Sequence, residues 1–375
     1  MRVLITGGGT GGHLYPALAV ADLLREKDPA GKILFVGTRT GLEGRVVPAR
    51  GYPFREIAAV KWPRGISLRM VSFLISLGKG YRQGLNIIRE FRPEVVFATG
   101  GYVSVPLVLA AARLKVPIFL HEQNSVPGLA NKFLARWARV VFTTFPPRSR
   151  DFPPGKRVVY AGLPVRREIL QTERSAGIKY FGLDPAHPTL LIMGGSRGAR
   201  RINETMLEIY QMIGRGQVAN LPFLQIIHIT GRDEYEDFCK QMEQKGIKED
   251  KIGKLLIKPY LEEMEYALAS ADLIISRAGA ATLAEVTARG IPAILIPYPF
   301  ATGNHQYYNA LFLAEKGAAV LIPEKDLTPV SLLEHIEKLV FDPSLRAALG
   351  EQARRFGRPE AGEIIARAIM RSGYK

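Results

Sequence analysis

GGGTGGH, residues 7–13, stands between the apolar run MRVLIT (residues 1–6) and an amphipathic run, residues 16–26. This order predicts a buried strand, a glycine-rich turn and a helix. Such a turn lets backbone N–H groups approach an anion at the positive end of the helix. The stretch lacks the Lys-Ser/Thr of a P-loop and the glycine spacing of GxGxxG. It adds a titratable imidazole, His13, beside the predicted anion-binding turn.

Short apolar runs alternate with helix-length segments along the rest of the chain. The expected strands of the first half are residues 1–6, 32–37, 94–100, 117–122 and 140–145. Those of the second half are residues 189–195, 223–231, 254–260, 273–279 and 292–298. This alternation is typical of the α/β class and predicts two Rossmann-like parallel-sheet domains facing across a cleft.

A Gly/Pro cluster at residues 162–164 marks the expected boundary between the two domains. The predicted domains are residues 1–162 and residues 163–358. The last helix, from about residue 359 to 375, is expected to return to the first domain.

The composition is typical of a soluble globular protein, and its charge indicates an anionic partner. The chain has 375 residues and one cysteine, which excludes a disulfide framework and a cysteine-based metal cluster. The sequence predicts neither a signal peptide nor a membrane span, so a cytoplasmic location is expected. The net charge is +16. Residues 1–160 hold 24 Lys+Arg against 9 Asp+Glu, and the remainder holds 27 against 26, so the first domain is expected to meet a polyanion.

Residues 61–92 combine seven basic residues and one acid, Glu90, with a nearly continuous apolar run. A basic, apolar helix of this kind can lie on an anionic membrane interface. It can equally pack one face on the core and expose a basic edge, and the residues alone leave both interpretations open.

Three further glycine-rich or small-residue turns follow predicted strands, at residues 99–106, 194–203 and 276–285. In open α/β sheets, ligands bind beyond the carboxyl ends of the strands, where all these turns are expected. The two turns of the second half predict a nucleotide-diphosphate site. Glu285 follows the last turn by about two helical turns and is placed to accept the hydroxyls of a ribose. The two turns of the first half predict a separate anion site.

Six motifs in chain order closely resemble the MurG family of peptidoglycan N-acetylglucosaminyltransferases. They are GGGTGGH, GGYVS (100–104), HEQN (121–124), GGSRGAR (194–200), RAGAATLAE (277–285) and HQYYNA (305–310), with GLPVR (162–166) at the domain joint. The resemblance spans the chain. It implies a GT-B fold and β-1,4 transfer, with inversion, of N-acetylglucosamine from UDP-GlcNAc to the MurNAc 4-hydroxyl of undecaprenyl-pyrophosphoryl-MurNAc-pentapeptide. It also implies a peripheral location on the cytoplasmic face of the plasma membrane, reached through residues 61–92.

The resemblance also implies roles for individual residues. The residues implied for UDP-GlcNAc are Thr10, Gly11, Gly12, Asn124, Arg166, Ser196, Leu261, Ala280, Ala281, Thr282, Leu283, Ala284, Glu285 and Gln306. Among them, Ser196 and Arg166 would bind the diphosphate, Leu261 the uracil, Glu285 the ribose and Gln306 the sugar hydroxyls. The residues implied for the acceptor pyrophosphate are Gly9, Gly100, Gly101 and Tyr102.

Glycosyl transfer needs a base for the attacking hydroxyl and an electrostatic sink for the leaving diphosphate. His13 is the favoured base, with Glu122 as the rival, and His121 is a candidate packing residue. The chain contains no Asp-x-Asp triplet of the kind that holds a metal in many glycosyltransferases. Helix N-termini at Ser196 and Ala280, with Arg166, can take the charge instead, so no tightly bound metal or other cofactor is expected.

Other functions compete with this reading. A related GT-B enzyme with another lipid acceptor, such as diacylglycerol, is the nearest alternative. A nicotinamide oxidoreductase is disfavoured because residues 7–13 do not match the dinucleotide signature and no acid closes the second strand. A nucleic-acid partner is not expected, because the chain has no recognition-helix, zinc-finger or RRM motif.

Overall fold

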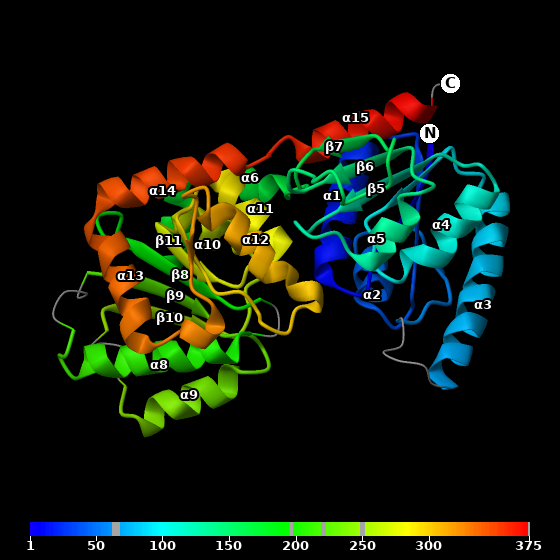
Figure 1. Cartoon of the computed structure of the whole chain (residues 1–375). Coiled ribbons are helices and arrows are strands. Elements are labelled where there is room, and N and C mark those ends of the chain that lie inside the picture. The colour runs from blue at the N-terminus through cyan, green and yellow to red at the C-terminus, as the bar shows by residue number, and fades with distance from the viewer. Residues whose placement is uncertain (62–67, 196–197, 219–222, 248–251, 374–375) are drawn as a thin grey trace. The chain divides into compact units, whose positions relative to one another are not determined.

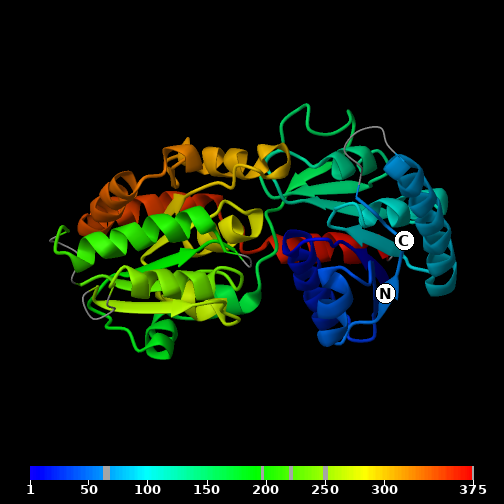
Figure 2. The same ribbon diagram turned by 90° about the horizontal axis from the view of Figure 1, so that it is seen from below.

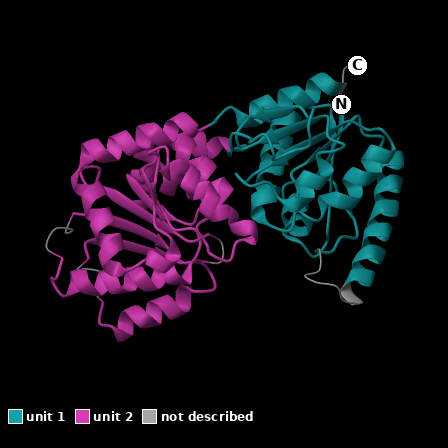
Figure 3. Ribbon diagram, in the orientation of Figure 1, with its two compact units in different colours: residues 1–165, 358–375 teal, residues 166–357 magenta. Residues whose placement is uncertain are grey.

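The computed structural model describes residues 1–61, 68–195, 198–218, 223–247 and 252–373. The chain divides into two compact units (Figure 3). Unit 1 comprises Met1–Val165 and Arg358–Lys375, and unit 2 comprises Arg166–Gly357. These divisions fall after residues 165 and 357, whereas the sequence analysis placed them after residues 162 and 358.

Unit 1 is a seven-stranded parallel sheet with helices on both faces (Figure 1). Its strands are β1 (Arg2–Thr6), β2 (Lys32–Gly37), β3 (Phe54–Glu56), β4 (Val95–Ala98), β5 (Ile118–Glu122), β6 (Val140–Thr143) and β7 (Val158–Tyr160). Its helices are α1 (Gly11–Lys27), α2 (Leu42–Ala49), α3 (Leu68–Phe91), α4 (Ser104–Arg113), α5 (Leu129–Leu134) and α15 (Ala361–Gly373). The strand order is β3-β2-β1-β4-β5-β6-β7.

Alternate residues of each strand in unit 1 enter two separate cores, because side chains alternate between the two faces of a sheet. Val3 and Ile5 of β1 pack with α1 and α15 on one face, and Leu4 packs with α3 and α4 on the other. Helix α15 lies against α1 (Figure 2), and the ion pair between Lys27 and Glu363 (3.0 Å) joins them. The C-terminal helix is therefore part of unit 1.

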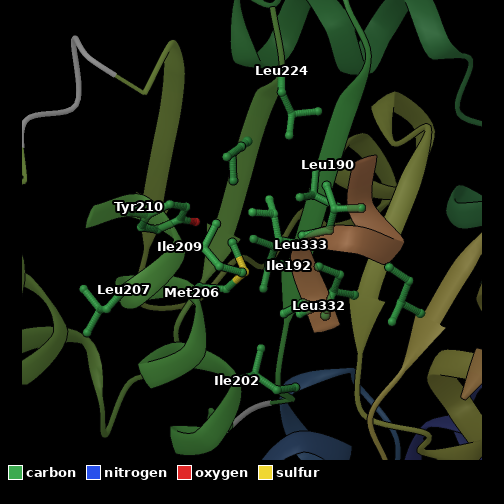
Figure 4. Close-up of a cluster of buried hydrophobic side chains, with 14 of the residues drawn as sticks. Leu190, Ile192, Ile202, Met206, Leu207, Ile209, Tyr210, Leu224, Leu332 and Leu333 are labelled. Carbon is green, nitrogen blue, oxygen red and sulfur yellow. The ribbon is translucent and has the colours of Figure 1, made fainter. Parts of the chain in front are cut away.

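Unit 2 is a six-stranded parallel sheet in the order β10-β9-β8-β11-β12-β13. Its strands are β8 (Thr189–Met193), β9 (Gln225–Ile229), β10 (Lys254–Lys258), β11 (Leu273–Ser276), β12 (Ala293–Leu295) and β13 (Val320–Leu321). Its helices are α6 (Arg167–Gln171), α7 (Arg174–Phe181), α8 (Arg200–Gly214), α9 (Tyr235–Gln244), α10 (Met264–Ser270), α11 (Ala280–Arg289), α12 (His305–Ala314), α13 (Pro329–Phe341) and α14 (Pro343–Phe356), with 3₁₀ turns η2 (Thr302–Asn304) and η3 (Glu324–Asp326). One core joins β8 and β9 to α8 and α13, with Leu190, Ile192, Met206 and Leu332 among its members (Figure 4).

The predicted α/β class with two parallel sheets is confirmed, and the ten expected strands are present. Three strands were missed: β3, β7 and β13. Each has two or three residues and stands at the edge of its sheet, where it pairs on one side only and carries little apolar pattern.

The first helix also differs from its prediction. It begins at Gly11 rather than near Pro16, although Pro16 lies inside it. Gly11, Gly12 and His13 therefore belong to its first turn and not to the preceding loop.

Candidate functional site

The glycine-rich turns lie at the points where the strand order of each sheet reverses. In unit 1 the reversal is between β1 and β4, and in unit 2 it is between β8 and β11. Connections leave in opposite directions from such a pair of strands, which opens a ligand-binding crevice beyond their carboxyl ends. The four turns predicted from the sequence follow these four strands and no others.

The two turns of unit 1 pack closely on each other. Gly9 has a φ of +79°, and a Cβ there would lie 2.9 Å from the Tyr102 ring. Gly101 has a φ of +81°, and a Cβ there would lie 2.8 Å from the Gly8 carbonyl and 3.3 Å from Cδ2 of His13. Only glycine allows this positive φ and this close approach without strain. The sequence-predicted residues Gly9, Gly101, Tyr102 and His13 therefore lie together.

The protonated nitrogen of His13 can be assigned from its partners. Nδ1 lies 2.9 Å from the Thr99 carbonyl and 3.0 Å from Oε1 of Gln123. The Gln123 amide is oriented by its Nε2 group, which donates to the Thr99 carbonyl at 2.7 Å. Since both partners of Nδ1 are acceptors, this nitrogen carries the proton in the neutral ring, and Nε2 is the basic nitrogen.

His121 holds Gln123 in place from the buried side. It is fully buried, and its Nε2 donates to the Gly162 carbonyl at 2.8 Å. Its Nδ1 then accepts from Nε2 of Gln123 at 3.2 Å. Burial lowers the pKa of His121 to about 4, so the ring stays neutral near pH 7. His121 is a packing residue that extends the hydrogen-bond chain behind His13.

Glu122, the rival base, is occupied by the loop that follows it. Its carboxylate is buried and accepts from the backbone N–H groups of Asn124 (2.9 Å) and Gly128 (3.0 Å). It also accepts from Nδ2 of Asn131 at 2.8 Å. These bonds fix residues 123–128 at the carboxyl end of β5 and place Asn124 near the switch point, which favours a positioning role for Glu122.

Three further residues of the site were missed by the sequence analysis. Glu43 is buried and accepts from the backbone N–H of Gly9 (3.0 Å) and of Thr38 (3.1 Å). The second is Thr99, whose Oγ1 donates to the His13 carbonyl at 2.7 Å. The third is Gln123, whose bonds to His13 and Thr99 are described above. Glu43 lies six residues beyond the second predicted strand, in the segment that follows the neighbour of β1 in the sheet, and no local pattern marked it.

Tyr102, which was predicted for the acceptor pyrophosphate, belongs to the second glycine turn, and its ring lies against Gly9 of the first. Burial and the charge of Glu43 raise the pKa of its hydroxyl. The hydroxyl therefore stays protonated and can donate to an anion.

In unit 2 the turn after β8 is partly described. Gly195 and Gly198 have φ values of +99° and +88°, and a Cβ on Gly198 would collide with the Thr230 carbonyl. The turn leads into α8, where Arg200 pairs with Glu204 at 2.9 Å. Ser196, predicted for the diphosphate, lies outside the described residues.

The turn after β11 leads directly into α11. Ala280, Ala281, Thr282, Leu283 and Ala284 form the first turns of this helix, and Glu285 follows them. The turn is held from two sides: Arg277 donates to the Ile296 carbonyl at 3.1 Å and pairs with Glu324. The buried Asn309 of α12 donates to the Ala278 carbonyl at 3.3 Å.

The carboxyl group of Glu285 is desolvated. Burial raises its pKa from 4.5 to about 7, while the nearby positive charge of Arg166 opposes the rise. No residue in the described ranges donates a hydrogen bond to its carboxylate. The structure thus brings together Glu285 and Arg166, which the sequence analysis assigned to one nucleotide. The oxygen atoms of the Glu285 carboxylate remain available to accept hydrogen bonds from a ligand.

Gln306 and Leu261 are the other predicted UDP-GlcNAc residues of unit 2. Gln306 is at the start of α12, and its Oε1 accepts from the Tyr298 N–H at 3.0 Å. Leu261 follows β10 and is buried. Beside it, the Arg232 guanidinium lies 4.2 Å from the centre of the Tyr260 ring.

Helix α3 exposes apolar side chains near its start. Val71, Leu74 and Ile75 are 56, 58 and 67% exposed, while Gly80 and Gly84 are buried on the side of α4. The core-facing interpretation of residues 61–92 therefore applies to one face of the helix only. Residues 62–67 lie outside the described residues. Helix α5 and its flank expose a second apolar group, Leu129, Phe133 and Trp137, next to Lys132 and Arg136.

Neither a bilayer-spanning helix nor a metal-binding cluster was found where the structure is described. None of the described helices is long and apolar enough to cross a membrane. No group of three or more His, Cys, Asp or Glu residues in those ranges is arranged to hold a metal ion.

Two family models match the chain. The glycosyltransferase family 28 N-terminal domain matches residues 3–143, and the glycosyltransferase family 28 C-terminal domain matches residues 189–363. Two relatives are named UDP-N-acetylglucosamine--N-acetylmuramyl-(pentapeptide) pyrophosphoryl-undecaprenol N-acetylglucosamine transferase. The one from Desulforamulus reducens is 44% identical and the one from Halothermothrix orenii is 43% identical. Each alignment covers 98% of both chains.

Solved structures show the same architecture. MurG of Acinetobacter baumannii superposes with a TM-score of 0.78 at 29% identity, covering 99% of both chains. A UDP-GlcNAc 2-epimerase from Neisseria meningitidis superposes with a TM-score of 0.67 at 13% identity, covering 99% of this chain and all of the other. The second likeness concerns the fold alone, which serves more than one reaction.

Proposed function

The chain belongs to glycosyltransferase family 28, and we propose that it is the N-acetylglucosamine transferase that its relatives are named for. It transfers N-acetylglucosamine from UDP-GlcNAc to the lipid-linked MurNAc-pentapeptide and forms the β-1,4-linked disaccharide with inversion. The observation that carries this proposal is the identity of 43–44% to relatives of that name over nearly the whole chain. The geometry of the two switch points supports it residue by residue.

The donor nucleotide is bound by unit 2. Glu285 accepts hydrogen bonds from the ribose hydroxyls, and its lack of a donor in the described protein supports this role. Arg166, Ser196 and the N-terminus of α11 at Ala280 receive the diphosphate. Leu261 contacts the uracil and Gln306 the sugar hydroxyls, while Thr10, Gly11, Gly12 and Asn124 of unit 1 contact the sugar.

The acceptor is bound by unit 1. Its pyrophosphate lies against the interlocked turns that contain Gly9, Gly100, Gly101 and Tyr102. Gly9, Gly100 and Gly101 have positive φ values, as is common in backbone concavities that bind anions, and the Gly9 N–H itself donates to Glu43. The Tyr102 hydroxyl, held protonated by its raised pKa, adds a donor.

His13 is the general base. Nε2 takes the proton of the MurNAc 4-hydroxyl as that oxygen attacks the anomeric carbon and the bond to the UDP oxygen breaks. Nδ1 keeps its proton and donates it to the Thr99 carbonyl and to Oε1 of Gln123, which support the imidazolium that forms. Glu122 positions the loop that carries Asn124. The leaving diphosphate is stabilised by Arg166 and the helix N-termini, so no tightly bound metal is required.

Unit 1 rests on the membrane that carries the acceptor. The apolar side chains Val71, Leu74 and Ile75 and the excess positive charge of residues 1–160 support this contact. Anionic lipids at the cytoplasmic face attract such a surface. The enzyme is accordingly peripheral there.

Transfer measured in EDTA tests the proposal. Purified protein is incubated with radiolabelled UDP-GlcNAc and an undecaprenyl-pyrophosphoryl-MurNAc-pentapeptide analogue, with diacylglycerol as a parallel acceptor. We expect transfer to the MurNAc acceptor alone. Transfer to diacylglycerol alone would contradict the acceptor assignment, and dependence on added metal would contradict the proposed leaving-group stabilisation.

A further inference from the structure

One cavity of unit 2 is rich in arginine and lies at the amino ends of the strands. Its volume is about 470 Å³, and it is lined by Asp272 and Pro292, which directly precede β11 and β12. The glycine-rich turns lie at the opposite, carboxyl ends of the strands. Four arginines line the cavity: Arg174 of α7, Arg289 of α11, and Arg346 and Arg354 of α14.

Backbone carbonyl groups hold all four guanidinium groups in place. Arg289 donates to the Ile169 and Thr172 carbonyls at 2.6 and 2.9 Å, and Arg346 donates to those of Leu339 and Val340 at 2.9 and 2.8 Å. The remaining two bonds of this kind join Arg174 to the Ser270 carbonyl (2.9 Å) and Arg354 to the Arg289 carbonyl (2.9 Å). A guanidinium group has five N–H donors, so these bonds fix the side chains and leave donors for a ligand.

The arginines of the cavity outnumber its acids. Asp272 pairs with Arg174 at 2.9 Å and also accepts from the Thr189 N–H. Glu351 pairs with Arg355, which is not part of the lining. Burial, and next to it the positive charge of Arg354, lower the pKa of Arg289. The cavity thus holds an excess of positive charge that a bound anion would relieve.

We propose that this arginine cavity binds a compact, multiply charged phosphate compound of the pyrophosphate class. Fixed guanidinium groups recognise phosphate oxygens through paired N–H donors, which favours phosphate over a single carboxylate. The volume lies in the range of small-molecule sites. Small residues, including Gly290, Pro292 and Ala347, form the walls between the arginines. At Gly290 a Cβ would lie 2.6 Å from Nε of Arg354, so the missing side chain makes room for that guanidinium group.

The site is separate from the proposed donor site but shares helix α11 with it. Glu285 and Arg289 stand one helical turn apart, and Arg289 holds α6, whose N-cap is Arg166. A binding experiment must therefore distinguish binding at the arginine cavity from binding at the donor site. Saturating UDP occupies the donor site, and each variant is checked for unchanged UDP affinity.

Titration calorimetry of the full chain with inorganic pyrophosphate tests the proposal, with UDP present throughout. We expect a binding event that weakens roughly tenfold or more in Arg354→Ala, as loss of a charge-assisted hydrogen bond predicts. Ala347→Glu keeps all four arginines and their anchoring bonds, and it should weaken binding similarly by adding a negative charge at the lining. Arg215→Ala, an exposed arginine of unit 2 outside the lining, is the control and should bind like the parent.

Two results would overturn the proposal. One is the absence of any pyrophosphate binding by the parent protein. The other is binding that is equally strong in the parent, Arg354→Ala and Ala347→Glu, since the pyrophosphate would then be bound elsewhere, for example by the glycine-rich turns of unit 1. Unchanged circular dichroism of Ala347→Glu separates a loss of binding from a loss of folding.

Discussion

Glu285 should make unit 2 less stable as the pH rises through neutrality. Its pKa is about 7 in the folded protein and 4.5 in its ordinary state. Between these values the folded state binds more protons than the unfolded state, so the free energy of unfolding falls with increasing pH. The full difference corresponds to about 3 kcal/mol. Since the residue as a whole is only half-buried, we take about 2 kcal/mol for the loss between pH 5 and pH 8.

Replacing Glu285 with Gln removes this dependence because the amide does not ionise. Glu285→Gln should therefore match the parent near pH 5 and exceed it by about 2 kcal/mol at pH 8. For a domain of the size of unit 2 this is about 4–8 °C in melting temperature. The same variant should bind UDP more weakly, since a carboxylate accepts ribose hydroxyls better than an amide.

Thermal unfolding followed by calorimetry from pH 5 to pH 8 measures the effect, with UDP affinity measured in parallel. Glu334→Gln, an exposed acid of α13 in the same unit, is the matched control and should follow the parent at every pH. The reasoning fails if the difference in melting temperature between Glu285→Gln and the parent is the same at pH 5 and pH 8.

Three further variants test the site and the surface of unit 1. His13→Ala should lower kcat by about 10²- to 10⁴-fold while UDP-GlcNAc binding, measured by calorimetry, is retained. An unchanged kcat would show that another residue is the base. Gln123→Leu should lower kcat roughly tenfold with an unchanged KM for UDP-GlcNAc, because the Nδ1 proton of His13 loses a partner; a change in KM alone would argue against this positioning role. Ile75→Glu should reduce sedimentation with phosphatidylglycerol vesicles roughly tenfold or more, whereas Tyr180→Glu, an exposed apolar position of unit 2, should not; equal losses would reject α3 as the contact.

Local patterns were sufficient to predict most of the architecture of this protein. Ten apolar runs identified the long strands because a strand buried on both faces must be apolar throughout. Glycine clusters at the strand ends identified the turns at both switch points, since few other residues tolerate a positive φ beside another backbone. The edge strands β3, β7 and β13 were not predicted, because two or three residues that pair with a single neighbouring strand give no periodic apolar pattern.

The sequence by itself determined which residue types surround each site, and the tertiary structure decided what each of them does. Along the chain, His13 is the favoured base and Glu122 remains its rival. Parallel pairing of β1, β4 and β5 brings Thr99 and Gln123 to Nδ1 of His13, whereas the loop after β5 folds back on Glu122. Burial, a property of the folded chain, likewise decides that His121 stays neutral and that Glu285 titrates near pH 7. Hydrogen bonds and desolvation between residues far apart in the chain are set by packing, and so they carry no local sequence signal.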